Sequence, residues 1–383
     1  MDRESEDRFP SRAARVRRVS LHGLGWQFAT FLVASILVLA LRASGQDAAS
    51  QIRTETEHLL QSLKDKPLSA PGTSEAADLL RRAQKDLSSG FLYVSLEELD
   101  QALDALQGAR AVAEKTEAVK SGLPAFESEW EKASLDLTAR ERETRETSWS
   151  SSPVAIRALA ETAQGQSIPL LEGGRGFATA LGPQEGLFYI GQAYGEAEFA
   201  KFCASLNLPR KTRPIPLRSM LPELVSLQQR TNAAFQPPRS IELHPRFIVL
   251  NGTLKLAEEL DFSRFYAGAL YQYLEGVLNY GMLDAKPLDD AEQSRVKSAI
   301  VAMRQQLEGS TRDDSIALLF LQRAQSQIGL AKDLPGNADE WKSAQVIVDQ
   351  VLPAYFAALK PASLLPVASG KTIDITLVRW PYT

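Results

Sequence analysis

Residues 92–106 read LYVSLEELDQALDAL, and this stretch points most directly to the fold. Its leucines recur at alternating steps of four and three, at Leu92, Leu96, Leu99, Leu103 and Leu106. That spacing places them on one face of a helix, which is the pattern of a helix-packing seam. A second apolar face precedes the stretch, and Gly90 lies between the two. The sequence therefore predicts a helical hairpin that turns at Gly90.

The start of the second arm of this hairpin has two interpretations. Ser95 and Glu98 form a capping-box pattern, with Val94 and Leu99 placed as its hydrophobic staple. On that pattern the helix begins as late as residue 95, and otherwise it begins directly after Gly90. Either start leaves the predicted hairpin intact.

The same helical composition extends over residues 46–147, where we expect N-terminal helical hairpins. Alanine, leucine, glutamate, lysine, arginine and glutamine are frequent there, and all are strong helix formers. Gly122-Leu123-Pro124 interrupts the pattern, and a strongly charged helix to about residue 147 is expected after it.

A middle helical segment is predicted for residues 148–208, with helices near 153–164, 167–180 and 184–206. Three prolines then exclude a helix over residues 209–216. This Pro/basic linker also carries Arg210, Lys211 and Arg213, and we expect it to be a solvated boundary between two halves. The alternative is a site for an anionic ligand or a lipid headgroup.

A C-terminal helical domain is predicted for residues 217–360, with helices near 217–234, 262–281, 290–308, 313–332 and 337–358. Residues 247–256 are ambiguous, because Asn251-Gly252 between apolar residues is a hairpin signal. The apolar residues also recur at helical steps that continue to Leu260, and this favours a helix. Residues 371–383 include an alternating run of β-branched residues, which predicts a short C-terminal β-strand.

Residues 250–283 resemble a tetratricopeptide (TPR) repeat, a helical hairpin of roughly 34 residues. The match includes Leu256, Ala257 and Leu260 in the first helix and Tyr266, Ala269, Tyr273 and Gly276 in the second. Residues 76–109 form a looser copy, and the repeat's usual final proline is replaced by Gly281. The resemblance implies an all-α fold, a TPR-like α-solenoid of helical hairpins whose groove binds peptides or protein partners.

Residues 1–45 have the pattern of a bacterial signal peptide. Four arginines between residues 12 and 18 precede an apolar run at 28–41, which is shorter than the roughly 20 residues of a membrane span. Ala43-Ser44-Gly45 offers a cleavage site before Gln46. An uncleaved signal anchor and a twin-arginine signal are the alternatives. We expect an exported protein that is periplasmic, secreted or anchored to the inner membrane.

Composition excludes several kinds of function. The net charge of −4 becomes more negative without residues 1–45, and this argues against nucleic acid as a partner. Cys203 is the only cysteine, so no intramolecular disulfide forms, and its apolar surroundings predict a buried, inert thiol. Widely separated histidines and the lack of paired metal-ligand spacings predict no metal and no cofactor.

Motifs of catalysis are equally scarce. The chain has neither a dinucleotide fingerprint nor a serine-hydrolase elbow, and Asp313 or Asp314 is better explained as a helix cap. The densest aromatic series, at 262–280, predicts core packing or an aromatic-lined groove, with Tyr271 and Tyr280 as its exposed, partner-binding pair. The leading hypothesis is an exported, non-catalytic scaffold that binds protein or peptide partners in the cell envelope. The alternative is an envelope hydrolase that acts on glycan or peptide through distant acidic residues.

Overall fold

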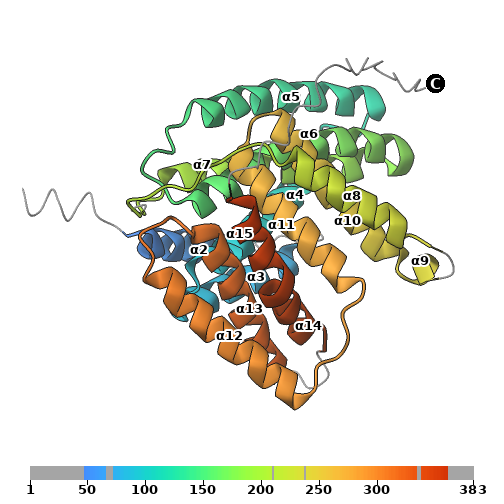
Figure 1. The fold of residues 1–383 in the computed structure, drawn as a ribbon. Helices are drawn as coiled ribbons and strands as arrows, with labels where there is room; N and C mark the ends of the chain where they lie inside the picture. Colours follow the sequence, from blue (N-terminus) through green and yellow to red (C-terminus); the bar gives the residue numbers. More distant parts are fainter. Residues whose placement is uncertain (1–46, 66–71, 209–210, 237–238, 334–337, 361–383) are drawn as a thin grey trace, which may run out of the picture. The chain divides into compact units, whose positions relative to one another are not determined.

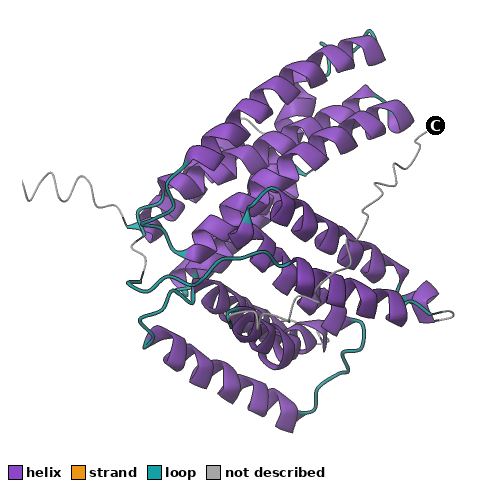
Figure 2. Cartoon of the chain, turned by 45° about the horizontal axis from the view of Figure 1, so that its top comes forward, coloured by secondary structure: helices purple, strands orange, loops and turns teal. Residues whose placement is uncertain are grey.

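The computed structural model describes residues 47–65, 72–208, 211–236, 239–333 and 338–360, and these are almost entirely helical (Figures 1 and 2). The elements are α2 (Ala48–Asp65), α3 (Thr73–Ser88), α4 (Leu92–Lys115), α5 (Leu123–Glu146), α6 (Val154–Leu181), α7 (Pro183–Ser205), α8 (Leu221–Ala234), α9 (Arg239–Glu242), α10 (His244–Phe262), α11 (Tyr266–Met282), α12 (Asp290–Glu308), α13 (Ser315–Asp333), α14 (Ala338–Val346), a π-helical turn (Ile347–Val351) and α15 (Leu352–Ala358). Within these ranges the chain forms no sheet, which confirms the all-α class.

The hairpin of α3 and α4 turns at Gly90 as predicted. Gly90 has φ of +79°, a left-handed conformation that favours glycine. The capping box at Ser95, however, is not formed, because α4 begins at Leu92 and the Ser95 hydroxyl donates to the Leu92 carbonyl at 2.8 Å. One N–H group at the N-terminus of α4 is paired with another helix, since the Tyr93 N–H donates to Oε1 of Gln322 at 2.9 Å.

The two helices predicted near 153–164 and 167–180 are one continuous helix, α6. Pro169 lies inside it and removes one backbone hydrogen bond. Residues on both sides of the proline are buried, among them Ala163 and Leu171, so tertiary packing outweighs the local penalty. The prediction of a break here was wrong because it weighed only local propensity.

Residues 247–256, where a β-hairpin was the alternative, lie in the middle of α10. The last predicted helix, near 337–358, is divided by the π-helical turn. Pro353 follows that turn and has no N–H to continue the α-helical pattern, which accounts for the change of hydrogen bonding there.

The described part of the linker, residues 211–216, is exposed except at Ile215, but it does not separate two compact units. The Lys211 ammonium donates to the carbonyls of Leu307, Glu308 and Ser310 at 2.8, 3.0 and 2.8 Å, and so caps the C-terminus of α12. Ile215 is buried, and residue 213 forms an isolated parallel bridge with residue 312. The described residues from Asp47 onward form one compact unit, and its larger core cluster draws residues from both sides of this linker.

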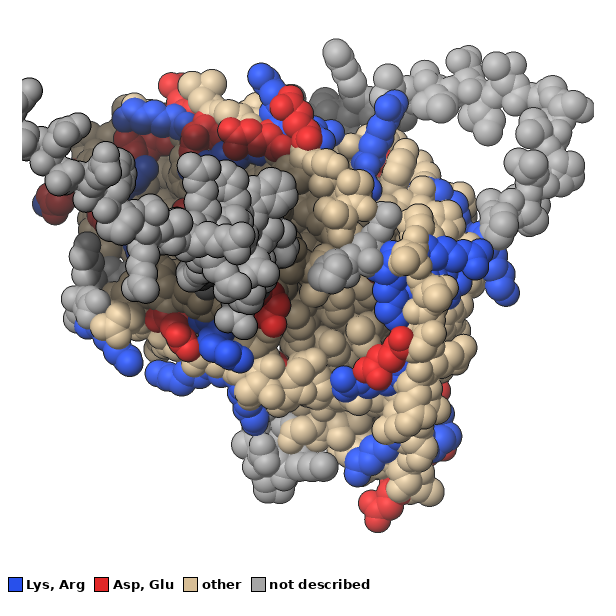
Figure 3. All heavy atoms as spheres, turned by 90° about the vertical axis from the view of Figure 1, so that its left-hand side faces the viewer, with Lys and Arg blue, Asp and Glu red and all other residues tan. Residues whose placement is uncertain are grey.

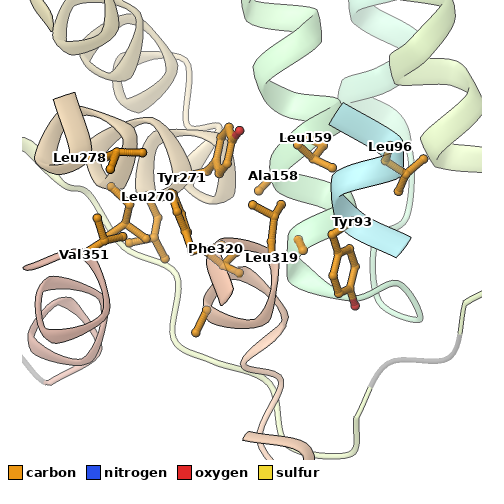
Figure 4. Packing of buried hydrophobic residues seen from close by; sticks show 14 of the residues in the cluster. Tyr93, Leu96, Ala158, Leu159, Leu270, Tyr271, Leu278, Leu319, Phe320 and Val351 are labelled. Atoms are coloured by element: carbon orange, nitrogen blue, oxygen red, sulfur yellow. The ribbon is translucent and has the colours of Figure 1, made fainter. Parts of the chain in front are cut away.

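The core brings together helices far apart in the sequence. Around Tyr271 of α11, Figure 4 shows side chains that come from α4, α6, α13 and the π-helical turn: Tyr93, Leu96, Ala158, Leu159, Leu319, Phe320 and Val351. The Tyr271 and Phe320 rings have centroids 5.8 Å apart. A smaller cluster, which includes Phe126 and Leu137, joins α5 to α6 and α7.

Buried side chains of one helix cap the N-termini of others. Oε2 of Glu161 in α6 accepts from the Ala267 and Gly268 N–H groups of α11, both at 2.9 Å. Oδ2 of Asp313 accepts from the Val154 N–H at the start of α6 at 2.9 Å, while its Oδ1 accepts from Ser315 N–H of α13 at 3.3 Å. The expectation that Asp313 is a cap is therefore confirmed, and it caps two helices.

None of the described helices is long and apolar enough to cross a membrane. On the face shown in Figure 3, basic and acidic side chains are interspersed. The predicted signal peptide, residues 1–45, and the predicted strand at 371–383 lie outside the described residues.

Candidate functional site

A cavity of about 430 Å³ lies where α4, α6, α7, α11 and α13 meet. Carboxylates dominate its charged lining, which consists of Glu97, Asp100, Asp104, Glu196, Glu275 and Arg323. Uncharged hydrogen-bonding side chains, such as those of Gln101, Gln272 and Asn279, line much of the rest. Among the described residues the lining therefore carries five carboxylates and one cation, and we call it the acidic cavity.

Glycines bring α4 and α7 close enough to form one wall of the acidic cavity. A Cβ at Gly191 would lie 2.2 Å from the Gln107 carbonyl oxygen, and one at Gly195 would lie 2.7 Å from Oδ1 of Asp104. A larger residue at either place would force the helices apart, because these distances are far below normal contact. The close approach sets Glu196, the residue after Gly195, against the carboxylates of α4.

Arg323 of α13 organises a second group of side chains in the acidic cavity. Its guanidinium pairs with Glu97 of α4 and with Glu275 of α11, the latter at 2.5 Å. Tyr271 donates to Oε1 of Glu97 at 2.6 Å, and one guanidinium nitrogen donates to the Tyr271 hydroxyl at 2.9 Å. The only cation of the lining, among the described residues, is thus already neutralised by two carboxylates.

Asp100, Asp104 and Glu196 form a separate cluster that we call the carboxylate triad. One oxygen from each lies within 4.8 Å of the other two. Asp100 and Asp104 are four residues apart on α4 and therefore share a helix face, whereas Glu196 comes from α7. When all three groups are ionised, the described chain offers no hydrogen-bond donor to Oδ1 of either aspartate or to Oε2 of Glu196, although all three atoms are buried.

These surroundings disfavour ionisation of the carboxylate triad. Burial, and then the charges of neighbouring carboxylates, raise the pKa of Asp100 and of Glu196 well above the usual range. Burial raises the pKa of Asp104 to about 8. Three carboxylates this close cannot all carry charge unless a cation joins them, so the cluster either retains protons or binds a positive ligand.

The structure does not bring the predicted pair Tyr271 and Tyr280 together. Tyr271 is buried, not exposed, and its hydroxyl belongs to the Arg323 network. Tyr280 is half-buried, with the Arg230 guanidinium 5.2 Å from its ring centroid, and it is not part of the lining. The two tyrosines are nine residues apart on α11, which rotates them by about 180° to opposite faces of the helix.

Reasoning from the sequence missed the carboxylate triad. The spacing of Asp100 and Asp104 was a readable signal, because two acidic residues four apart on a helix face the same way. Glu196 could not be added, since it is far away in the sequence and only the packing of α4 on α7 places it there.

Comparisons of the chain with protein-family models, curated proteins and solved structures find no match.

Proposed function

We propose that this protein is an exported, non-catalytic helical scaffold of the bacterial cell envelope, and that it binds a protein or peptide partner through the acidic cavity. The observation that carries the proposal is the composition of the lining, with five carboxylates against one arginine and many amide and hydroxyl groups. A lining of this kind favours a polar, positively charged ligand, such as a lysine or arginine side chain of the partner. The cavity volume of about 430 Å³ is in the range of ordinary ligand sites.

The finer features expected of the fold belong to this proposal. In a TPR-like α-solenoid, successive hairpins are closely packed through small residues, and α10 with α11 has this character. A Cβ at Gly276 of α11 would lie 2.9 Å from Cδ2 of Leu254 in α10, so the glycine permits a close approach. The predicted strand at residues 371–383 would then be a separate addition to the helical array.

Peptide binding tests the proposal. The probes are a fluorescein-labelled hexapeptide with two lysines and a matched peptide with glutamine at both positions. We expect fluorescence anisotropy to show saturable binding of the lysine peptide only, weakening as NaCl is raised, because the attraction is electrostatic.

A pair of charge-matched variants locates the binding. Gln101 is an exposed residue of the lining, and Gln101→Lys should weaken binding of the lysine peptide at least tenfold. Gln306→Lys adds the same charge at an exposed position of α12 that does not belong to the lining, and it should leave binding unchanged. Equal binding of the two peptides, or an equal effect of the two variants, would contradict the proposal.

Export has its own test. Amino-terminal sequencing of the protein recovered from the periplasm or medium should begin at or near Gln46. An intact Met1 or Asp2 start, recovered in the membrane fraction, would instead support the anchor alternative.

A second candidate function is the envelope hydrolase, which the convergence of acidic residues in one cavity favours. Glycosidases of the common type need one protonated and one ionised carboxyl group, with environments that separate the two pKa values. In the carboxylate triad all three pKa values are raised, so the triad does not combine one raised and one ordinary pKa. Release of soluble fragments from purified peptidoglycan by the protein, but not by its Asp104→Asn variant, would establish the hydrolase and overturn the scaffold.

A further inference from the structure

The carboxylate triad has the features of a metal site whose ligands lack any other partner. Glu196 is only 1% exposed, and its Oε2 finds no hydrogen-bond donor within the described residues. Leaving a buried acceptor unpaired is costly, and a charged acceptor costs more than a neutral one. Oδ1 of Asp100 and Oδ1 of Asp104 are also buried and lack a hydrogen-bond donor. Three buried oxygens that converge without donors call for a positive charge between them.

The lining offers no side chain for that role. Its one cation among the described residues, Arg323, is held by Glu97 and Glu275 and by the Tyr271 hydroxyl. If it turned to the triad, Glu97 and Glu275 would lose their partner. For the triad to be ionised, the compensating charge must therefore come from outside the chain.

We infer that Asp100, Asp104 and Glu196 bind one hard divalent cation, and that Ca²⁺ is the best fit. An all-oxygen ligand set without histidine or cysteine selects Ca²⁺, Mg²⁺ or Mn²⁺ over the softer transition metals. Ca²⁺ binds oxygen at about 2.3–2.6 Å, so two of its ligands are at most about 5 Å apart. The oxygens of the triad lie within 4.8 Å of one another, which is inside that limit.

The approach of α4 to α7 preorganises these ligands. Gly195 leaves no side chain between the two helices, and a Cβ there would occupy the position next to Oδ1 of Asp104. The helix backbones hold Asp100 and Asp104 one turn apart, with Glu196 opposite them. Little ordering is then needed when the ion binds, which favours affinity.

The inference goes beyond the proposed partner binding and does not depend on it. With the ion bound, two carboxylates, Glu97 and Glu275, still accompany the single Arg323. The charge of the three triad carboxylates also exceeds that of one divalent ion. The cavity therefore remains acidic, and a basic partner could still enter it.

Isothermal titration of the EDTA-treated, dialysed protein with CaCl₂ tests the inference. We expect saturable binding of one Ca²⁺ per chain and a higher thermal unfolding midpoint with Ca²⁺ than without it. Glu196→Gln should lower the affinity at least tenfold and remove the thermal shift. Glu114→Gln, the same change at an exposed position of α4, should leave both unchanged.

The metal-free proteins supply a control for folding. Without metal, Glu196→Gln should unfold at or above the midpoint of the parent protein, because the amide removes one of three crowded carboxylates. Should that variant fail to fold, Asp104→Asn takes its place in the same titration. If Mg²⁺ or Mn²⁺ binds instead, and the same variants abolish that binding, the site is supported but its preferred ion is not Ca²⁺.

Two outcomes overturn the inference. One is that none of Ca²⁺, Mg²⁺ and Mn²⁺ binds saturably. The other is that Glu196→Gln and Asp104→Asn bind the metal ion with the affinity of the parent protein. Binding of the lysine peptide in EDTA, with no metal binding, would overturn this inference and leave the proposed function standing. Metal binding without peptide binding would support this inference and overturn the proposed function.

Discussion

Substitution of Gly191 by alanine should destabilise the protein, although alanine is by far the better helix former. The new Cβ would lie 2.2 Å from the Gln107 carbonyl oxygen and 2.6 Å from the Gly108 Cα of α4. Both atoms belong to the backbone, so no side-chain rotation relieves the contact and the two helices must separate. Overpacking of this kind costs about 1–3 kcal/mol, and backbone contacts place it near the upper end.

The helix propensity of alanine offsets part of that cost, by about 1 kcal/mol. The net loss in free energy of unfolding should therefore be about 2 kcal/mol. Gly252→Ala provides the matched control, because Gly252 lies in α10 and a Cβ there would meet nothing within 4 Å. That variant should gain up to about 1 kcal/mol, so the two substitutions differ by about 3 kcal/mol.

Urea denaturation followed by far-UV circular dichroism measures both variants against the parent protein. The midpoint should fall for Gly191→Ala and rise for Gly252→Ala, with similar dependence on urea concentration. A midpoint that rises for both would refute the account of the α4–α7 approach. The same loss of packing should also weaken Ca²⁺ binding in Gly191→Ala, because it moves Glu196 away from the aspartates.

Three further outcomes follow from the buried groups. Glu161→Ala leaves the N–H groups of Ala267 and Gly268 without their acceptor, so urea denaturation should show a free energy of unfolding lower by about 2 kcal/mol. Glu161→Gln keeps one acceptor oxygen, so its free energy of unfolding should fall by less. Burial, aided by the Asp86 charge, raises the pKa of Glu98 from 4.5 to about 8. The folded state therefore binds this proton more tightly than the unfolded state, and the free energy of unfolding should decline as pH rises from 4.5 to 8. Glu98→Gln should flatten that part of a profile of stability against pH. Cys203 is fully buried and burial raises its pKa, so iodoacetamide should leave it unmodified at pH 8 until urea unfolds the protein; modification of the folded protein would contradict this placement.

Local patterns predicted most helices, because a helix shows its buried face at steps of three and four along the chain. The hairpin at Gly90 and the helix across residues 247–256 both followed from that spacing. What failed depended on distant residues. The alternative start at Ser95 was not used, because α4 begins at Leu92 and Gln322 accepts from its Tyr93 N–H. Pro169 did not end α6, because residues on both sides of it are buried.

The candidate site divides in the same way. Asp100 and Asp104 could be paired from their spacing alone, and the opposite placement of Tyr271 and Tyr280 also followed from simple helix geometry that the prediction did not apply. Glu196 and Arg323 could not be assigned to the cavity, since they join it through contacts between helices remote in the sequence. Acidic residues that form a site only by packing leave no local motif.

The caps that pass between helices bear on how such a chain can change during evolution. In a linear repeat array each unit interacts with its neighbours alone, so units are readily duplicated or lost. Here α6 depends on Asp313, α4 on Gln322 and α11 on Glu161, and the first two of these links join residues that are 159 and 229 positions apart in the sequence. Deleting one hairpin would expose uncapped termini elsewhere. We expect descendants of this chain to vary in loops and surface residues while the number of their helices stays constant.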